Sequence, residues 1–593
     1  MKQFFKIMFA SFLGTLLVIA FMLFLTIVIG AGSIASFSSE KAVAVKPHTV
    51  LHMKLDYSIN DRTPSESFDF SLSNLTGGIK ASDGSGLNDI LRNINAAAKD
   101  SNIDGIYLDL SSVGASSATM KEIRDKLIEF KESGKFILSY SEGYSQGAYY
   151  LASVADEVML NPDGMLDFHG MSAQIMFYKH LLEKAGVEMQ IVRGPNNRFK
   201  SAVEPYFLDK MSDANREQME KLLGSVWGDI VNDISKSRNI SVERLNQIAD
   251  SLETMFSAEK ALENKLVDRL VYKDEVIDRL KELTSTEKIN CVSNADYALN
   301  SKDSKLKKDK VAVVYAIGEI NGGEGDDTSI GSETTSKAIR KARTDKNVKA
   351  IVLRVNSPGG SAVASEIIRR EIELAKKEKP VIVSMGDYAA SGGYWISTNT
   401  DYIFAQPTTL TGSIGVFGVI PNAQELLTEK VGLTFDVAKT NANADFGSLS
   451  QPLTPFQMAK LQESVGKTYN DFTSLVGRTR NLTQTYVDSI GQGRVWSGRD
   501  ALELGLVDEL GGLEKAIAYA AEKAGLKEYS ITELPRQKNM MEKIMEMTKP
   551  SNEIDAVMKS KLGSYYSYFK AVENLVNAND PIQARIPFEM VVE

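Results

Sequence analysis

The sequence predicts an α/β protein that contains two copies of one βαβ-rich unit behind an N-terminal transmembrane helix. Short β-branched apolar runs alternate with helical patterns along most of the chain, which is typical of parallel sheets covered by helices. Residues 144–162 align with residues 389–407 at a constant shift of 245, which indicates an internal duplication. Residues 7–29 are apolar and carry no charge.

The bulk composition narrows the class of protein. The chain has 593 residues, 43% hydrophobic and 24% charged, which is ordinary for a folded protein of several domains. The net charge is −9 and no basic domain stands out, so we expect no nucleic-acid partner. Cys291 is the single cysteine, which excludes an internal disulfide and a cysteine-based zinc site. No HExxH or GxxxxGK[ST] motif occurs, and we expect no cofactor or metal.

The N-terminal segment, residues 1–35, is expected to be a membrane anchor. Its apolar run, residues 7–29, is long enough to span a bilayer and longer than the core of a cleaved signal peptide. Lys2 and Lys6 precede the run, so we expect the N-terminus to stay in the cytoplasm and the bulk of the protein to face the other side.

Residues 36–300 form the first predicted half. Two helical patterns, 117–131 and 174–185, and a polar helical arm from about 209 to 265 accompany its strands. The expected strands are 50–55, 103–110, 136–140, 157–160 and 187–192. A lysine-rich stretch, residues 301–310, follows as a linker.

Residues 301–535 repeat this scheme as the second half. One helix carries an apolar stripe at Ala364, Ile368, Ile372 and Ala375, and a long helix is expected over 454–479. The expected strands are 311–315, 350–355, 381–384, 402–405 and 435–438. The sequence assigns no structure or role to the tail, residues 536–593.

The stretch 381–396 holds a candidate nucleophile. A buried strand is expected to end at Gly386, and Ser391 then opens a short helix together with Gly392. A hydroxyl at the first turn of a helix lies among unpaired N–H groups, which is how a nucleophile and part of an oxyanion hole can be built together. The alternative is a serine that only caps the helix.

The two copies differ where this chemistry would lie. Gln146 is the counterpart of Ser391, so the first half lacks the nucleophile. Gly359-Gly360 follows a strand and can aim N–H groups at an oxyanion together with Gly392, whereas the first half has Gly114-Ala115 there. The first half instead contains Lys200, which suggests one active site divided between the halves.

A serine needs a base, and no histidine follows His180. A lysine amine can serve if burial lowers its pKa by roughly 2–3 units from about 10.4. Lys200 is the candidate base, and Ser413 is a candidate to orient its amine; their alternatives are a solvated loop lysine and a turn serine. His169, whose counterpart is Ile414 beside Ser413, and Lys439 remain alternative bases.

Four motifs support a family resemblance. VLRVNSPGGS (352–361), MGDYAASGGYWIS (385–397), TLTGSIGVFG (409–418) and FKSAVEP (199–205) resemble the long form of the signal peptide peptidase A (protease IV) family. The resemblance implies tandem crotonase/Clp-protease-like domains and a Ser/Lys dyad in which Ser391 is the nucleophile, Lys200 the general base and Ser413 its positioning residue. It also implies a homotetramer at the inner membrane, with a periplasmic catalytic part that degrades cleaved signal peptides and other apolar peptides.

Two other classes of function stay open at the level of sequence. The same fold could serve as a non-catalytic membrane scaffold that binds peptides or partner proteins. Acyl-CoA chemistry also occurs on crotonase-like folds, but it fits poorly with an extracytoplasmic domain.

Overall fold

The computed structural model describes Gly14, Glu542 and residues 44–64, 84–298, 307–538 and 582–585. The expected membrane span, residues 7–29, lies outside these residues except for Gly14, as does most of the tail. In the part of the chain that is described, no helix is both long and apolar enough to cross a bilayer.

The first half is built on a parallel six-stranded sheet in the order β6-β4-β3-β2-β1-β7. Its apolar strands are mostly buried, as expected for a parallel sheet covered by helices. The strands are β1 (Thr49–Met53), β2 (Ile103–Asp109), β3 (Phe136–Tyr144), β4 (Glu157–Leu166), β6 (Arg269–Leu270) and β7 (Asn290–Ser293). The helices are α2 (Leu87–Lys99), α3 (Ser117–Lys131), α4 (Gln146–Ala152), α5 (Lys179–Ala185), η2 (Ser201–Tyr206), α6 (Asp213–Arg238), α7 (Val242–Ser251), α8 (Ala258–Glu263), α9 (Lys273–Thr284) and α10 (Asn294–Tyr297).

The second half has the corresponding sheet in the order β17-β15-β13-β11-β8-β19, with β14 beside β13 and β18 beside β14. The strands are β8 (Lys310–Ile317), β11 (Val348–Ser357), β13 (Val381–Ala390), β14 (Tyr402–Ala405), β15 (Leu410–Gly412), β17 (Val495–Ser497), β18 (Glu509–Leu510) and β19 (Ser530–Leu534). The helices are α11 (Ser332–Thr344), α12 (Ala362–Lys376), α13 (Gly392–Ser397), the π-helical turn η3 (Leu426–Lys430), α14 (Pro455–Arg480), α15 (Gln484–Ile490), α16 (Gly498–Glu503) and α17 (Leu513–Lys523).

The duplication extends to details that lie outside the aligned motifs. Helices α6 and α14 each have 26 residues, and each ends at an asparagine in the left-handed conformation. Near these ends, Arg238 contacts Asp268 and Arg480 contacts Asp508, both at 2.7 Å. Corresponding residues therefore make corresponding contacts, so the two halves share one fold.

A third sheet joins the halves. Its order is β10-β9-β12-β20-β16-β5, with β10 (Ser329–Gly331), β9 (Glu319–Asn321), β12 (Gly359–Ser361), β20 (Ile582–Arg585), β16 (Phe417–Asn422) and β5 (Glu188–Arg193). Strand β5 belongs to the first half and pairs antiparallel with β16 of the second. This pairing carries the chain that follows β5, including Lys200, into the second half.

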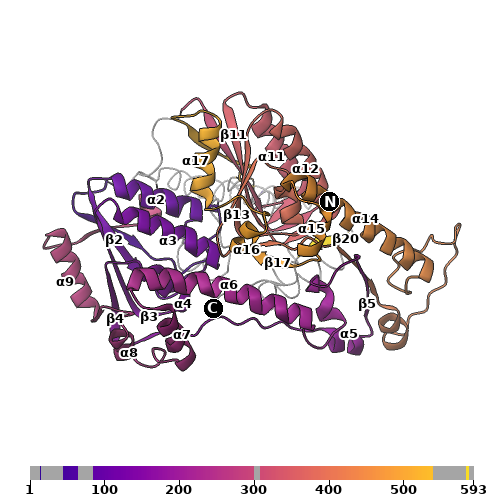
Figure 1. Cartoon of the computed structure of the whole chain (residues 1–593), viewed down its shortest axis with the longest axis horizontal. Coiled ribbons are helices and arrows are strands. Elements are labelled where there is room, and N and C mark those ends of the chain that lie inside the picture. The colour runs from indigo at the N-terminus through magenta and orange to yellow at the C-terminus, as the bar shows by residue number, and fades with distance from the viewer. Residues whose placement is uncertain are drawn as a thin grey trace, which may run out of the picture.

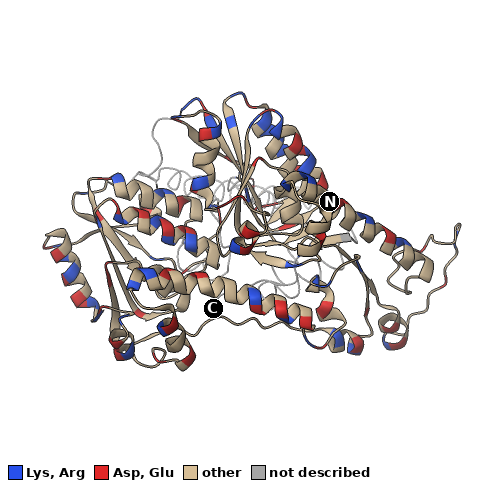
Figure 2. Cartoon of the chain, viewed as in Figure 1, with Lys and Arg blue, Asp and Glu red and all other residues tan. Residues whose placement is uncertain are grey.

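The halves also share their cores. Ala390, Leu410 and Val495 of the second half pack in the apolar cluster of the first, and Val192 of the first packs in that of the second. Helix α6 runs from the first half along the second (Figure 1), where Gln218 Oε1 accepts a hydrogen bond of 2.8 Å from the Val495 N–H. The charged residues lie mainly on the helices, with both signs mixed (Figure 2).

Three expectations about elements were wrong. Residues 435–438 form no strand; the side chains of Phe435 and Val437 are about half exposed, and no strand in the described part of the chain pairs with this segment. Strand β5 pairs with β16, residues 417–422. Strand β13 does not end at Gly386 but continues to Ala390, because its last residues pair with β15. Helix α5 begins at Lys179 rather than at residue 174.

Candidate active site

Ser391 lies between the end of β13 and the start of α13 in a strained backbone conformation. Its φ is 55° and its ψ is −111°, which is rare for a residue with a side chain and costs on the order of 1–3 kcal/mol. The conformation is held by hydrogen bonds of 2.8 Å from the Ser391 N–H to Gly412 O and from the Trp395 N–H to Ser391 O. The Ser391 side chain caps no helix N–H, so its hydroxyl does not serve as a simple N-cap.

Lys200 reaches this serine from the first half. Its Nζ lies 2.9 Å from Ser391 Oγ, 3.0 Å from Ser413 Oγ and 3.3 Å from Ser413 O. All three residues are completely buried. A neutral amine has two N–H donors and one lone pair, so it can donate to Ser413 and still accept the proton of Ser391.

Burial lowers the pKa of Lys200 well below its usual value, because desolvation disfavours the ammonium ion and no carboxylate among the described residues offsets this effect. The ring of Phe417 lies 5.9 Å from Nζ and forms part of the surrounding surface. A buried lysine with no acidic partner beside a serine is a strong candidate for a catalytic base.

Ser413 has the geometry of a positioning residue. Its own φ is 48°, and its hydroxyl donates to Gly493 O at 3.3 Å while facing the amine of Lys200. The Ser413 N–H donates to Arg494 O at 2.7 Å, which fixes the turn. Ser391 and Ser413 therefore both have strained backbones, and the hydroxyls of both contact the amine of Lys200.

The predicted oxyanion glycines surround the nucleophile. Gly359 and Gly360 have φ values of 105° and 153°, which disfavour any residue with a Cβ. The Gly359 N–H already donates to Ser357 Oγ at 3.2 Å, so it is engaged. A Cβ on Gly392 would lie 3.1 Å from Gly360 N, which brings the N–H groups of Gly360 and Gly392 into one small space. These two remain the candidates for oxyanion donors.

Two residues that shape the site were not found by the sequence. A Cβ on Gly493 would lie 2.4 Å from the Cβ of Lys200, and a Cβ on Gly415 would lie 3.1 Å from its Cδ. Both glycines therefore make room for the lysine stem. No local sequence pattern shows that a lysine from the other half packs against either glycine.

The alternative bases lie in other surroundings. The His169 imidazole pairs with Asp167, and its backbone N–H donates to Gln146 Oε1 at 3.1 Å in the first half. Lys439 forms an ion pair with Asp445. The hydroxyl of Ser391 contacts neither of them; besides Lys200, it donates to Gly415 O at 3.4 Å.

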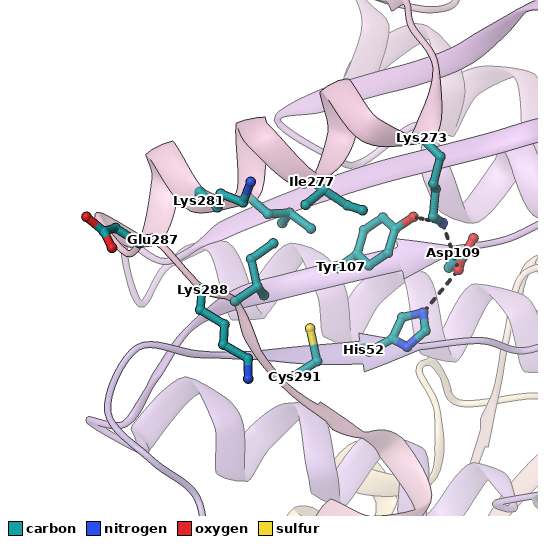
Figure 3. A pocket seen from close by; sticks show the side chains of 11 residues that line it. His52, Tyr107, Asp109, Lys273, Ile277, Lys281, Glu287, Lys288 and Cys291 are labelled. Atoms are coloured by element: carbon teal, nitrogen blue, oxygen red, sulfur yellow. Dashed lines mark hydrogen bonds and ion pairs between the residues drawn. The ribbon is translucent and has the colours of Figure 1, made fainter.

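A separate pocket lies in the first half (Figure 3) and shares no lining residue with the Ser391 site. Asp109 accepts contacts of 3.1 Å from both His52 and Lys273 there, and the Lys273 amine also donates to the Tyr107 hydroxyl. Burial raises the pKa of Asp109, but these hydrogen bonds outweigh it and lower the pKa overall. The polar groups satisfy one another, so this pocket shows no nucleophile activated by a base.

The family follows from comparison with known proteins. The model of "Peptidase family S49" matches residues 129–287 and 373–527, one segment in each half. The chain is 40% identical to "Protease 4" of Salmonella typhi over 83% of this chain and 82% of that protein. It is 32% identical to "Serine protease SPPA, chloroplastic" of Arabidopsis thaliana over 91% of this chain and 78% of that protein. The chain therefore belongs to peptidase family S49 and is a serine peptidase.

Solved structures add little to this assignment. A ClpP1 variant from Listeria monocytogenes matches 35% of this chain and 94% of its own, with 16% identity and a TM-score of 0.24. The α/β fold and its duplication follow from the sheets themselves.

Proposed function

We propose that this peptidase is a membrane-anchored endopeptidase that uses Ser391 as nucleophile and Lys200 as general base, with Ser413 positioning the amine. Its substrates are apolar peptides, including signal peptides already cleaved from their proteins. The observation that carries the proposal is the distance of 2.9 Å between the buried Lys200 Nζ and Ser391 Oγ. The substrate class and the membrane side come from the family resemblance and from residues 7–29.

The chemistry runs in two stages. The neutral amine of Lys200 takes the hydroxyl proton while Ser391 Oγ attacks the peptide carbonyl, and the N–H groups of Gly360 and Gly392 receive the developing oxyanion. The ammonium then protonates the leaving amine. Water hydrolyses the resulting ester with Lys200 again acting as base, which restores the enzyme.

Hydrolysis of an apolar peptide ester tests the dyad. Lys200→Met replaces the amine with an apolar side chain of similar length and should lower kcat by several orders of magnitude. The controls Lys439→Met and His169→Ala should stay near the wild-type rate. Full activity in Lys200→Met would refute the dyad. Loss of activity in His169→Ala, with an apparent pKa near 6.5, would favour the imidazole as base.

Covalent labelling separates a peptidase from a scaffold. A fluorophosphonate should modify the wild-type protein at Ser391 and leave Ser391→Ala unmodified. An unmodified wild-type protein that still binds apolar peptides would support the non-catalytic scaffold instead.

Assembly into a homotetramer at the inner membrane, with a periplasmic catalytic part, completes the proposal. Apolar side chains are exposed along one segment of the second half, which supports self-association. They are Val431, Leu433, Phe435, Val437, Phe446 and Leu449. Light scattering should give a tetramer for the wild-type protein and smaller species for the double variant Phe435→Asp and Val437→Asp. The side of the membrane is tested separately, with a reporter fused after residue 593 that should be found in the periplasm.

A further inference from the structure

Strands β11 and β13 are neighbours in the sheet of the second half (Figure 1), and each leads into one part of the active site. Strand β11 leads to the oxyanion glycines, and β13 leads to Ser391. Their parallel pairing is interrupted after Val355 and resumes at Ser357, so that Asn356 alone faces residues 386–388 of β13. Three residues opposite one form a bulge, which lies directly before the turn of the nucleophile.

The side-chain amide of Asn356 fills this bulge. Its Oδ1 accepts a hydrogen bond of 3.0 Å from the Tyr388 N–H, so the side chain takes the place of a backbone carbonyl in the ladder. A Cβ on Gly386 would lie 3.0 Å from the Asn356 Cγ, so the amide packs closely against the first residue of the bulge. The bulge is therefore shaped around one side chain.

The other end of the amide is held by two buried carboxylates. The Asn356 Nδ2 donates to Asp61 Oδ2 at 2.6 Å and to Asp387 Oδ2 at 3.4 Å. Asp61 belongs to the first half. Asp387 lies in the middle of the bulge, and it accepts hydrogen bonds of 2.9 and 2.8 Å from the N–H and the hydroxyl of Thr119, on helix α3 of the first half. The first half therefore holds both the amide and the bulge.

The second half has one residue more in this stretch than the first half. Tyr140 and Ser384 pair with residues of β2 and β11 that correspond at the shift of 245. Gln146 follows Tyr140 by six positions, whereas Ser391 follows Ser384 by seven. The bulge accommodates this extra residue, and after it the capped helix start of the first half is replaced by the strained turn of Ser391.

We propose that Asn356 is a positioning residue for Ser391. Its amide holds the bulge of β13 in the shape that gives Ser391 its strained turn, and it connects that turn to Asp61 and Thr119 of the first half. The inference rests on the proposed function of Ser391 and goes beyond it, because it gives the first half a second task besides supplying Lys200.

The nucleophile needs this support for a physical reason. The φ of 55° at Ser391 is unfavourable, so the surrounding contacts must hold it. A shift of the hydroxyl would also lengthen the contact of 2.9 Å between Ser391 Oγ and Lys200 Nζ. A misplacement of about 1 Å in an active site can lower the rate about 10²-fold.

Hydrolysis of an apolar peptide ester by variants of Asn356 tests the proposal. Asn356→Leu keeps the size of the side chain but removes its hydrogen bonds, so kcat should fall about 10²-fold while KM stays within a few fold. Asn356→Ser introduces the residue that the first half has at this position, Ser111, and should lose a similar factor because a serine is too short to fill the bulge. Ser111→Asn is the matched control and should keep the wild-type rate.

Asn356→Asp gives a reversible test within one folded protein. A protonated carboxyl can accept the backbone hydrogen bond and donate to Asp61, as the amide does. An ionised carboxyl cannot donate, and it faces the carboxylates of Asp61 and Asp387. The Arg354 guanidinium is shared between Asp61 and Glu122, so it offsets this repulsion only in part.

The quantity to measure is the kcat of Asn356→Asp divided by that of the wild type at each pH, because this ratio cancels the titration of Lys200. The ratio should fall about tenfold or more as the pH rises and recover when the pH is lowered. Urea midpoints at both ends of the range show that the variant stays folded, so this measurement decides the question even if Asn356→Leu does not fold. A ratio that does not change with pH, or a wild-type kcat in Asn356→Leu, would overturn the positioning role and leave the peptidase assignment standing. A wild-type protein that neither hydrolyses the ester nor reacts with a fluorophosphonate would refute the proposed function itself.

Discussion

The two halves of this chain share a fold but not a chemistry, and the difference is concentrated in one turn. In the second half, Ser391 has a positive φ and α13 starts after it, at Gly392. In the first half, the counterpart Gln146 is already the first residue of α4, and Ser145 caps that helix by accepting a hydrogen bond from the Ala148 N–H. The strained turn that holds Ser391 in the second half is therefore an ordinary capped helix start in the first half.

The side chain of Gln146 closes the first-half site. Its Oε1 accepts hydrogen bonds from the N–H groups of His169 and Gly170, and its Nε2 donates to Gly170 O. In the second half the corresponding space receives Lys200 from the other copy. In the proposed mechanism one copy supplies the base and the other the nucleophile, so the duplication separates the two functions of the dyad.

The largest expected effect is the loss of the nucleophile. Ser391→Ala should lower kcat/KM for a peptide ester on the order of 10⁴-fold or more, since loss of a catalytic serine leaves only binding and oxyanion stabilisation. Gln146→Ala is the matched control in the other half and should stay within a few fold of wild type. Equal losses in both variants would contradict the division of roles.

The oxyanion turn should give the next largest effect. In Gly360→Ala the new Cβ would lie 2.1 Å from Ile320 O at a φ of 153°, so the turn must shift and move its N–H. The expected loss in kcat is about 10²–10³-fold. The first half carries Ala115 at this position, and Gly322→Ala, where a Cβ meets nothing within 4 Å, should be silent. A silent Gly360→Ala would remove this glycine from the proposed oxyanion hole.

A buried charge network between the halves should control stability. Arg354 Nε contacts Asp61 at 2.5 Å and its Nη2 lies 2.7 Å from Glu122, and all three side chains are almost fully buried. Arg354→Met would leave two buried carboxylates unpaired, which costs about 3–5 kcal/mol in the free energy of unfolding. Urea unfolding measures this, with the more exposed Arg370→Met as control. An unchanged midpoint would show that the halves do not depend on this contact.

The smallest effect concerns pH and the positioning of the amine. Because the pKa of Lys200 is lowered, kcat/KM should rise with pH through that depressed pKa and level off above it, where the amine is neutral. Ser413→Ala removes an acceptor that favours the ammonium, so the acid limb should move to lower pH while kcat falls about tenfold. A fall in kcat with an unmoved acid limb would mean that Ser413 only supports the fold.

The lowered pKa of Lys200 also predicts how the stability of the fold changes with pH. Between the depressed pKa of folded Lys200 and its unfolded value near 10.4, the unfolded chain binds more protons, so stability should rise with pH across that window. The free energy of unfolding of the wild type and of Lys200→Met should be measured across this pH window. The part of the rise with pH that comes from Lys200 should be missing in the methionine variant.

The sequence by itself determined the duplicated α/β architecture and named Ser391 and Lys200 as candidate nucleophile and base. It also showed that the first half has no serine at the position of Ser391. Those features can be read from short stretches of sequence. Buried strands are rich in β-branched residues, and α12 has an apolar stripe. Gln146 aligns with Ser391 at the constant shift of 245, which does not depend on the fold. Helix α3 was predicted with the observed bounds for the same reason.

Only the tertiary structure decided how the halves meet. The pairing of β5 with β16, the glycines that make room for Lys200 and the position of β20 all join residues that are far apart in the chain. The alternation Ile582, Ala584, Ile586 is compatible with a strand, but a strand pattern does not name its neighbours. Strand partners are chosen by the register and edges of the assembled sheets, and these exist only once both halves have folded.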